Sequence, residues 1–322
     1  MQNSRFSIVG AFVLAAMPVA AMAQQPSPTD LTAPGPAGAL HGSLIDAGKA
    51  SPVVLIVPGS GPTDRDGNNR YGVKAAPYRL LAEALAARAI STVRIDKRGM
   101  FGSKAAIADA NKVTIADYAA DVTAWVKAAR AATGARCVWL LGHSEGGLVV
   151  LATPDAPGIC GRILVSAAGR SFGVLIKDQI HANPANAIIF DQADAALTKL
   201  AAGEHVDTAG MHPGLLGLFA PAVQDYLIDL MRYRPAELAA KSKGPLLIVQ
   251  GENDIQIGVE DARMLAAGRK DAKLVLLPGV NHVLKQVGDA DRAANTASYA
   301  NPDLPIDSSV VAAIAGFVLT KR

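Results

Sequence analysis

The sequence predicts a protein of the α/β class, with a mostly parallel sheet, helices on both of its faces and a helical cap inserted between two strands. From about residue 30, apolar runs of strand length alternate with amphipathic helical segments, an order typical of parallel sheets. Half of the 322 residues are hydrophobic, which is enough for a substantial core. Between residues 170 and 243 the alternation stops, because helical stretches follow one another there without a convincing strand.

Composition excludes several functional classes. The 31 Lys and Arg residues nearly balance the 28 Asp and Glu residues, and no dense basic tract occurs, so nucleic acid is not an expected partner. The two cysteines form no CxxC pair, and the sequence contains no HExxH motif or comparable cluster of His and carboxylate residues. We therefore expect no metal site.

Residues 1–23 have the pattern of a cleavable signal peptide. Arg5 precedes an apolar run, and the small residues of an Ala-Met-Ala sequence end at Ala23, which predicts cleavage there and export to the periplasm or the medium. An uncleaved membrane anchor is the alternative, but Pro18 interrupts the run and the run is short for a bilayer span. We expect a mature chain without stable membrane insertion.

The predicted elements define a core and a cap. The core, residues 24–169 and 244–322, contains predicted strands at 53–57, 92–96, 138–141, 163–166, 246–250 and 274–277. Helices are predicted at 77–87, from residue 115 to about 129, and at 309–319; Thr114 and Asp117 resemble a capping box.

The cap, residues 170–243, should lie over a ligand site, since open α/β sheets bind ligands at the carboxyl ends of their strands. Helical stretches are predicted at 184–200 and 221–233. The apolar side chains of the cap, among them Leu215, Phe219 and Leu227, could line a pocket, but for any single one we favour packing of the cap on the core.

Cys137 and Cys160 lie near the starts of two successive predicted strands. Parallel neighbours have their amino-terminal ends together, and export would place the chain in an oxidising compartment, so a disulfide is plausible. Two buried free thiols are the alternative. In either case we expect a structural role.

Residues 142–146 read GHSEG, a G-x-S-x-G motif between a predicted strand and a helical stretch. In such a turn the serine is strained so that its Oγ projects, and the flanking glycines allow close approach of neighbouring backbone. An ordinary N-cap serine is the alternative. The strand–turn–helix context favours Ser144 as a nucleophile.

A serine hydroxyl is a weak nucleophile near neutral pH, so Ser144 requires a base and a group that orients the base. Asp254 and His282 each follow a late predicted strand, and they give the order Ser, Asp, His along the chain. Glu252 and Asp261 are weaker candidates for the acid.

The other histidines fit the role of base less well. His143 lies inside the motif and should point away from the serine Oγ, and His41 precedes the first predicted strand. The remaining three lie in the predicted cap: His181, His205 and His212.

An oxyanion would require two N–H donors. The residue after the nucleophile, Glu145, is one expected donor, and the loop PGSGP at 58–62 supplies the other. Ser60 is the favoured residue of this loop and Gly61 the second choice, with a plain turn as the alternative. Charged residues at 63–68 and 96–99 should meet at the same rim, where we predict ion pairs that fix the loops rather than substrate contacts.

Together these motifs resemble those of bacterial serine esterases of the α/β-hydrolase superfamily, in the group of serine-aminopeptidase-like hydrolases. The matching stretches are GSGPTDRDGN (59–68), DKRG (96–99), GHSEGG (142–147), DIQ (254–256) and NHVLK (281–285). The resemblance implies the α/β-hydrolase fold, a triad of Ser144, Asp254 and His282, and an oxyanion hole at Ser60 and Glu145. It also implies hydrolysis of carboxylic esters with short to medium acyl chains, without a cofactor.

The predicted function is therefore that of a carboxylesterase acting on small-molecule esters through an acyl-enzyme. A peptidase or amidase with the same triad is the first alternative; acidic cap residues such as Glu204 and Asp207 could bind a peptide terminus. A non-catalytic binding protein is the second alternative, and the presence of all three triad residues argues against it. Serine at the motif, where a dehalogenase has aspartate, disfavours that activity.

Overall fold

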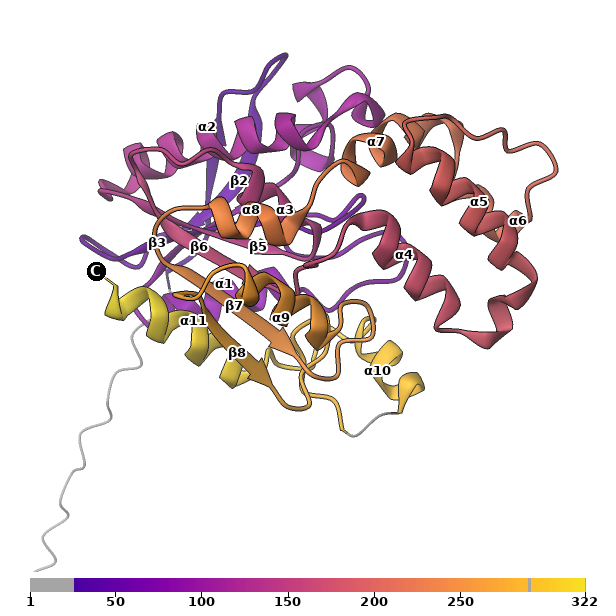
Figure 1. Ribbon diagram of the computed structural model, residues 1–322. Helices are drawn as coiled ribbons and strands as arrows, with labels where there is room; N and C mark the ends of the chain where they lie inside the picture. The colour runs from indigo at the N-terminus through magenta and orange to yellow at the C-terminus, as the bar shows by residue number, and fades with distance from the viewer. Residues whose placement is uncertain (1–25, 289–290, 322) are drawn as a thin grey trace, which may run out of the picture.

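The computed structural model describes residues 26–288 and 291–321, whose eight strands form one sheet with helices on both faces (Figure 1). The predicted signal peptide lies outside the described residues. The strand order is β1-β2-β4-β3-β5-β6-β7-β8, and all neighbours from β4 to β8 are parallel. The predicted fold class is therefore confirmed.

Six of the strands correspond to predicted ones, and β1 and β2 were not predicted. The strands are β1 (Thr29–Ala33), β2 (Leu40–Ile45), β3 (Val53–Val57), β4 (Ser91–Ile95), β5 (Val138–His143), β6 (Ile159–Val165), β7 (Leu246–Gly251) and β8 (Lys273–Leu277). β1 and β2 are antiparallel to their neighbours at one edge of the sheet, and polar residues interrupt their apolar pattern. His41, expected before the first strand, lies inside β2.

The central strands are buried on both faces because alternate side chains enter two separate layers. In β3, Leu55 packs in the cluster that contains α2 (Ile115–Thr133) and α3 (Glu145–Ala152). Ile56 packs in the opposite cluster, with α1 (Pro77–Ala86) and α11 (Ser308–Thr320). The predicted capping box of α2 is present, since Thr114 and Asp117 bond reciprocally.

Between β6 and β7 the chain forms a series of helices, of which the first ones extend from the carboxyl ends of the strands (Figure 1). They are α4 (Phe172–His181), η3 (Pro184–Ile189), α5 (Phe190–Ala201), α6 (Pro213–Leu216), α7 (Pro221–Met231) and α8 (Pro235–Lys241). Helices α5 and α7 bury apolar side chains against each other, whereas α8 lies against α3 and α9 (Val259–Ala267) beside the sheet.

The remaining elements are short and border the site. They are η1 (Phe101–Ala106), η2 (Ala110–Lys112) and α10 (Arg292–Ser298). Within the part of the chain that the structure describes, we find no helix that combines the length and the apolar character of a bilayer span.

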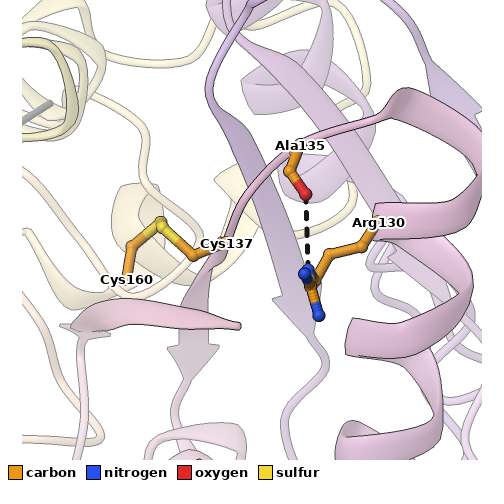
Figure 2. Close-up of a disulfide and its surroundings, with 4 residues drawn as sticks. All are labelled: Arg130, Ala135, Cys137 and Cys160. Carbon is orange, nitrogen blue, oxygen red and sulfur yellow. Dashed lines mark hydrogen bonds between the residues drawn. A yellow bond between two sulfur atoms is a disulfide. The ribbon is translucent and has the colours of Figure 1, made fainter. Parts of the chain in front are cut away.

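Cys137 and Cys160 form a disulfide that joins the residue before β5 to the second residue of β6 (Figure 2). Their Cα atoms are 5.2 Å apart. The pairing that the sequence left open is therefore present, at the amino-terminal edge of the sheet and away from the loops that follow the strands.

We predict that replacing both cysteines by serine lowers the free energy of unfolding by about 3 kcal/mol, because the crosslink restricts the unfolded chain over a separation of 23 residues. Urea titrations of the wild-type protein and the double variant would measure the difference. Dithiothreitol should destabilise the wild-type protein to the same extent and leave the variant unaffected. Equal stabilities would contradict a bridging role.

Candidate active site

Ser144 lies at the carboxyl end of β5, in the sharp turn into α3. Its φ of 54° and ψ of −124° are rare for a residue other than glycine, as expected of a strained, projecting serine. A Cβ at Gly142 would lie 2.1 Å from the carbonyl oxygen of Gly146, and one at Gly146 would lie 2.3 Å from that of Val57. Both flanking glycines are therefore required by the close approach of backbone.

Asp254 and His282 meet in the loops after β7 and β8. His282 Nδ1 lies 2.8 Å from Asp254 Oδ2, and both side chains are buried. Asp254 Oδ1 accepts hydrogen bonds from the backbone N–H groups of Gln256 and Ile257, at 2.8 and 2.9 Å. Burial alone would raise the pKa of Asp254, but the His282 charge and these hydrogen bonds lower it below its ordinary value. The ionised carboxylate orients the ring so that Nε2 is left to act as a base.

Ser144 and His282 line one cavity of about 160 Å³. The hydrogen bonds of the described residues join His282 to Asp254 but do not join the Ser144 hydroxyl to the His282 ring. Contacts between a nucleophile and its base commonly shorten only when substrate binds. The structure thus brings the three predicted residues to one rim of the sheet, with a direct bond between two of them.

The loop at 58–62 after β3, the candidate oxyanion loop, is held against this turn. Gly59 donates its N–H to the Tyr78 hydroxyl at 3.1 Å, and its carbonyl oxygen accepts from Lys97 Nζ at 2.7 Å. Among the hydrogen bonds of the described chain, none uses the N–H of Ser60 or of Glu145. These two donors are thus available beside Ser144. The N–H of Gly61 is also unused in the same set, so it remains the second choice.

Both ring nitrogens of His143 are engaged in hydrogen bonds that connect two loops around Ser144. Its Nε2 lies 2.9 Å from the carbonyl oxygen of His282, and its Nδ1 lies 2.8 Å from the Tyr78 hydroxyl. A carbonyl oxygen can only accept, so Nε2 carries the proton and Nδ1 accepts from Tyr78. Together with the bond from Gly59, this chain links the oxyanion loop to the backbone of His282. Tyr78 was not predicted, since one tyrosine at a helix start carries no local signal.

Ion pairs fix the neighbouring loops, as predicted. Arg65 Nη2 lies 2.6 Å from Asp96 Oδ2, and Lys97 Nζ lies 3.1 Å from Glu145 Oε1. The Lys97 and Glu145 side chains are only 2% and 5% exposed, so this pair is part of the interior. The Lys97 ammonium also lies 5.0 Å from the centre of the Tyr118 ring. The Glu145 side chain is thereby held by the core.

The weaker candidates have other partners. Asp261 pairs with Arg170 at 2.7 Å and accepts from the N–H of Gly169, which makes it structural, and Glu252 is exposed. In the inserted helices, His181 and His205 bond to carboxylates and His212 caps α6. No group of three or more metal-binding side chains is found in residues 26–288 and 291–321.

A second, larger cavity of about 390 Å³ also has Ser144 in its wall and lies beneath the inserted helices α4 and α7. Its walls are mostly apolar and include Leu148, Phe172, Leu175, Ile176, Leu218, Leu227 and Leu230. Of the apolar residues expected in the cap, Leu215 and Phe219 pack inside the helices instead. Both interpretations of the cap residues thus hold, each for different side chains.

The model of the alpha/beta hydrolase family matches residues 53–295. Esterase EstD of Thermotoga maritima is 25% identical over 240 residues, which cover 72% of this chain and 54% of EstD, so the chain spans about half of that relative's length.

Solved structures share the fold at low sequence identity. A thermophilic esterase from Thermogutta terrifontis superposes with a TM-score of 0.54 at 17% identity, over 92% of this chain and 99% of that one. Est1E from Butyrivibrio proteoclasticus gives 0.54 at 18% identity, over 91% and 98%. Both likenesses confirm the architecture.

We predict that His143 makes stability depend on pH. Burial lowers the pKa of this imidazole from 6.5 to about 3, so the folded protein keeps it neutral while the unfolded chain binds a proton below pH 6.5. The contribution of neutral His143 to the free energy of unfolding is fully present above pH 6.5. It falls by about 1.4 kcal/mol per pH unit between pH 6.5 and about 3.

Urea unfolding at pH 7 and pH 5 would measure this pH-dependent loss of unfolding free energy. His143→Gln is the matched variant, since its side chain cannot titrate. The wild-type protein should lose about 2 kcal/mol more than the variant over that interval. Parallel losses in both proteins would show that His143 is protonated in the folded state.

Proposed function

The chain belongs to the alpha/beta hydrolase family, and from that premise we propose that it is a serine carboxylesterase acting on small-molecule esters. The observation that carries the proposal is the strained Ser144 at the same rim as the bonded pair of His282 and Asp254. The unused N–H groups of Ser60 and Glu145 beside it support the same chemistry.

In the proposed acylation step, His282 Nε2 removes the proton from Ser144 Oγ as Oγ bonds to the ester carbonyl carbon. The carbonyl oxygen becomes an oxyanion and accepts hydrogen bonds from the two backbone N–H groups. The imidazolium then donates its proton to the departing alkoxide, so that an alcohol leaves and the acyl group remains on Ser144. Asp254 stays ionised and stabilises the imidazolium.

Deacylation reverses these roles. Water loses a proton to His282 Nε2 as its oxygen bonds to the acyl carbon, and the same N–H groups bind the second oxyanion. The tetrahedral intermediate collapses when the C–Oγ bond breaks and His282 returns the proton to Ser144. A carboxylic acid leaves, and the free serine is restored.

The walls of the cavities favour an ester over a peptide. The apolar cavity of about 390 Å³ suits an acyl chain of short to medium length. A peptide amino terminus would require a carboxylate near the site, yet Glu204 and Asp207 line neither of the two cavities at Ser144. Glu145 lines one of them, but it is already paired with Lys97.

We also propose that the chain is exported by the leader at residues 1–23. The Cys137–Cys160 bridge supports this, because disulfides persist in oxidising compartments and are rare in the cytosol. The intact mass of the protein recovered from the periplasm or medium of an expressing bacterium should correspond to a chain that begins at Gln24. A full-length chain in the membrane fraction would contradict cleavage.

The esterase proposal predicts hydrolysis of p-nitrophenyl esters with an optimum at short to medium acyl chains and little turnover of palmitate. Ser144→Ala should lower kcat by at least about 10⁴-fold, because the nucleophile is lost. Initial rates at 405 nm across a graded acyl series would measure both. The control is Ser51→Ala, which changes a serine before β3, at the opposite edge of the sheet, and should retain wild-type rates.

Undiminished turnover by Ser144→Ala would exclude the proposed nucleophile. A panel of peptide amides measured beside the esters would distinguish the two hydrolase activities: faster cleavage of amides than of activated esters would favour the peptidase alternative.

A further inference from the structure

A third cavity, of about 640 Å³, adjoins the site and has no part in the mechanism above. It lies between the oxyanion loop, η1, η2, α2 and α7. Gly61, Val223 and Tyr226 form walls of both this cavity and the apolar one that contains Ser144. A molecule with its ester carbonyl at Ser144 could therefore extend one end into each.

Aromatic side chains on the walls of this cavity are unusually exposed. Tyr71 is 70% exposed and Phe101 is 47% exposed, although large aromatic side chains are normally well buried. The backbone of Phe101 has a φ of 43°, a conformation that costs free energy for any residue other than glycine. The exposed rings offer a surface on which another ring can stack.

One polar group on the shared wall is incompletely satisfied. The Tyr226 hydroxyl is buried, and the Glu145 carboxylate lies near it without a well-formed hydrogen bond, although buried hydroxyls are almost always satisfied. Burial and the nearby Glu145 carboxylate raise its pKa, so the group is a protonated donor at any physiological pH. A bound ester or carbonyl oxygen would satisfy it.

The charge of the lining is positive. Arg70 and Lys97 line the cavity, and the described lining residues include no carboxylate. Lys97 is already held by Glu145 and the Gly59 carbonyl oxygen. Arg70 donates to the Tyr71 hydroxyl at 3.0 Å and lies 5.1 Å from the centre of that ring, but no described carboxylate lies within 4.0 Å of its guanidinium. Its other N–H donors remain available for an anion.

We propose that this cavity is a second substrate subsite, which binds an end of the ester that carries both an aromatic ring and a negative charge. The ring packs between Phe101 and Tyr71, and the anion pairs with Arg70. Tyr226 donates a hydrogen bond to an oxygen between the ring and the scissile carbonyl. The inference rests on the proposed esterase activity and narrows its substrate class to charged aromatic esters.

Two matched pairs of esters test this subsite. Phenyl acetate and 4-carboxyphenyl acetate place the ring on the alcohol side, whereas ethyl benzoate and monoethyl terephthalate place it on the acyl side. In at least one pair, Arg70→Gln should raise KM for the charged ester by about five- to twentyfold, because a charge-assisted contact is lost. In the same variant, the kcat for the charged ester and the kcat and KM for the neutral ester should change by less than about twofold.

Matched variants separate this effect from general damage. Arg88→Gln removes an exposed arginine just after α1 that does not line the cavity. This variant should leave kcat and KM for both pairs of esters unchanged. Tyr226→Phe removes only the hydroxyl and should lower kcat/KM for the aromatic esters more than for ethyl acetate.

The outcomes distinguish the two proposals. If the wild-type protein hydrolyses none of the esters, neutral or charged, the esterase assignment fails, and the subsite fails with it. If neutral esters are hydrolysed but charged ones are not, or if Arg70→Gln affects both members of each pair equally, the subsite alone is refuted.

Discussion

The backbone of Ser144 is held in a conformation that residues other than glycine rarely adopt, and the organisation of the site depends on this turn. Such a conformation costs about 1–3 kcal/mol, and it persists only where the surrounding structure determines it. Here the Ser144 N–H donates to the Val165 carbonyl of the next strand, and the Ser144 carbonyl accepts from Gly147. The central position of β5, between β3 and β6, supplies this support.

Buried polar contacts then set the loops around the turn. The chain from Gly59 through Tyr78 and His143 reaches the backbone of His282, and Lys97 joins Gly59 to the side chain of Glu145. Buried ion pairs contribute little net stability because desolvation opposes them. These hydrogen bonds and this ion pair act by positioning. They connect the loops that follow β3, β4, β5 and β8, around the residues of the proposed machinery.

The cavities around the nucleophile differ in their linings. The space beneath α4 and α7 contains Ser144 and is lined mainly by aliphatic side chains, whereas the space beside η1 is bordered by the exposed rings of Tyr71 and Phe101. Only Gly61, Val223 and Tyr226 are common to both linings. Because α7 contributes two of these residues, the position of one inserted helix shapes both cavities, and its replacement in a relative would change specificity without altering the turn at Ser144.

The sequence by itself determined the parts that depend on local pattern. Apolar runs located the six core strands, glycine spacing located the Ser144 turn, and the ends of strands placed Asp254 and His282 at one rim. The edge strands β1 and β2 were not predicted, because a partly exposed strand needs no apolar run. The tertiary structure alone decided the disulfide, the role of His143, the choice among the acids and the separation of the cavities. Each of these depends on distances between segments far apart in the chain, which no local period encodes.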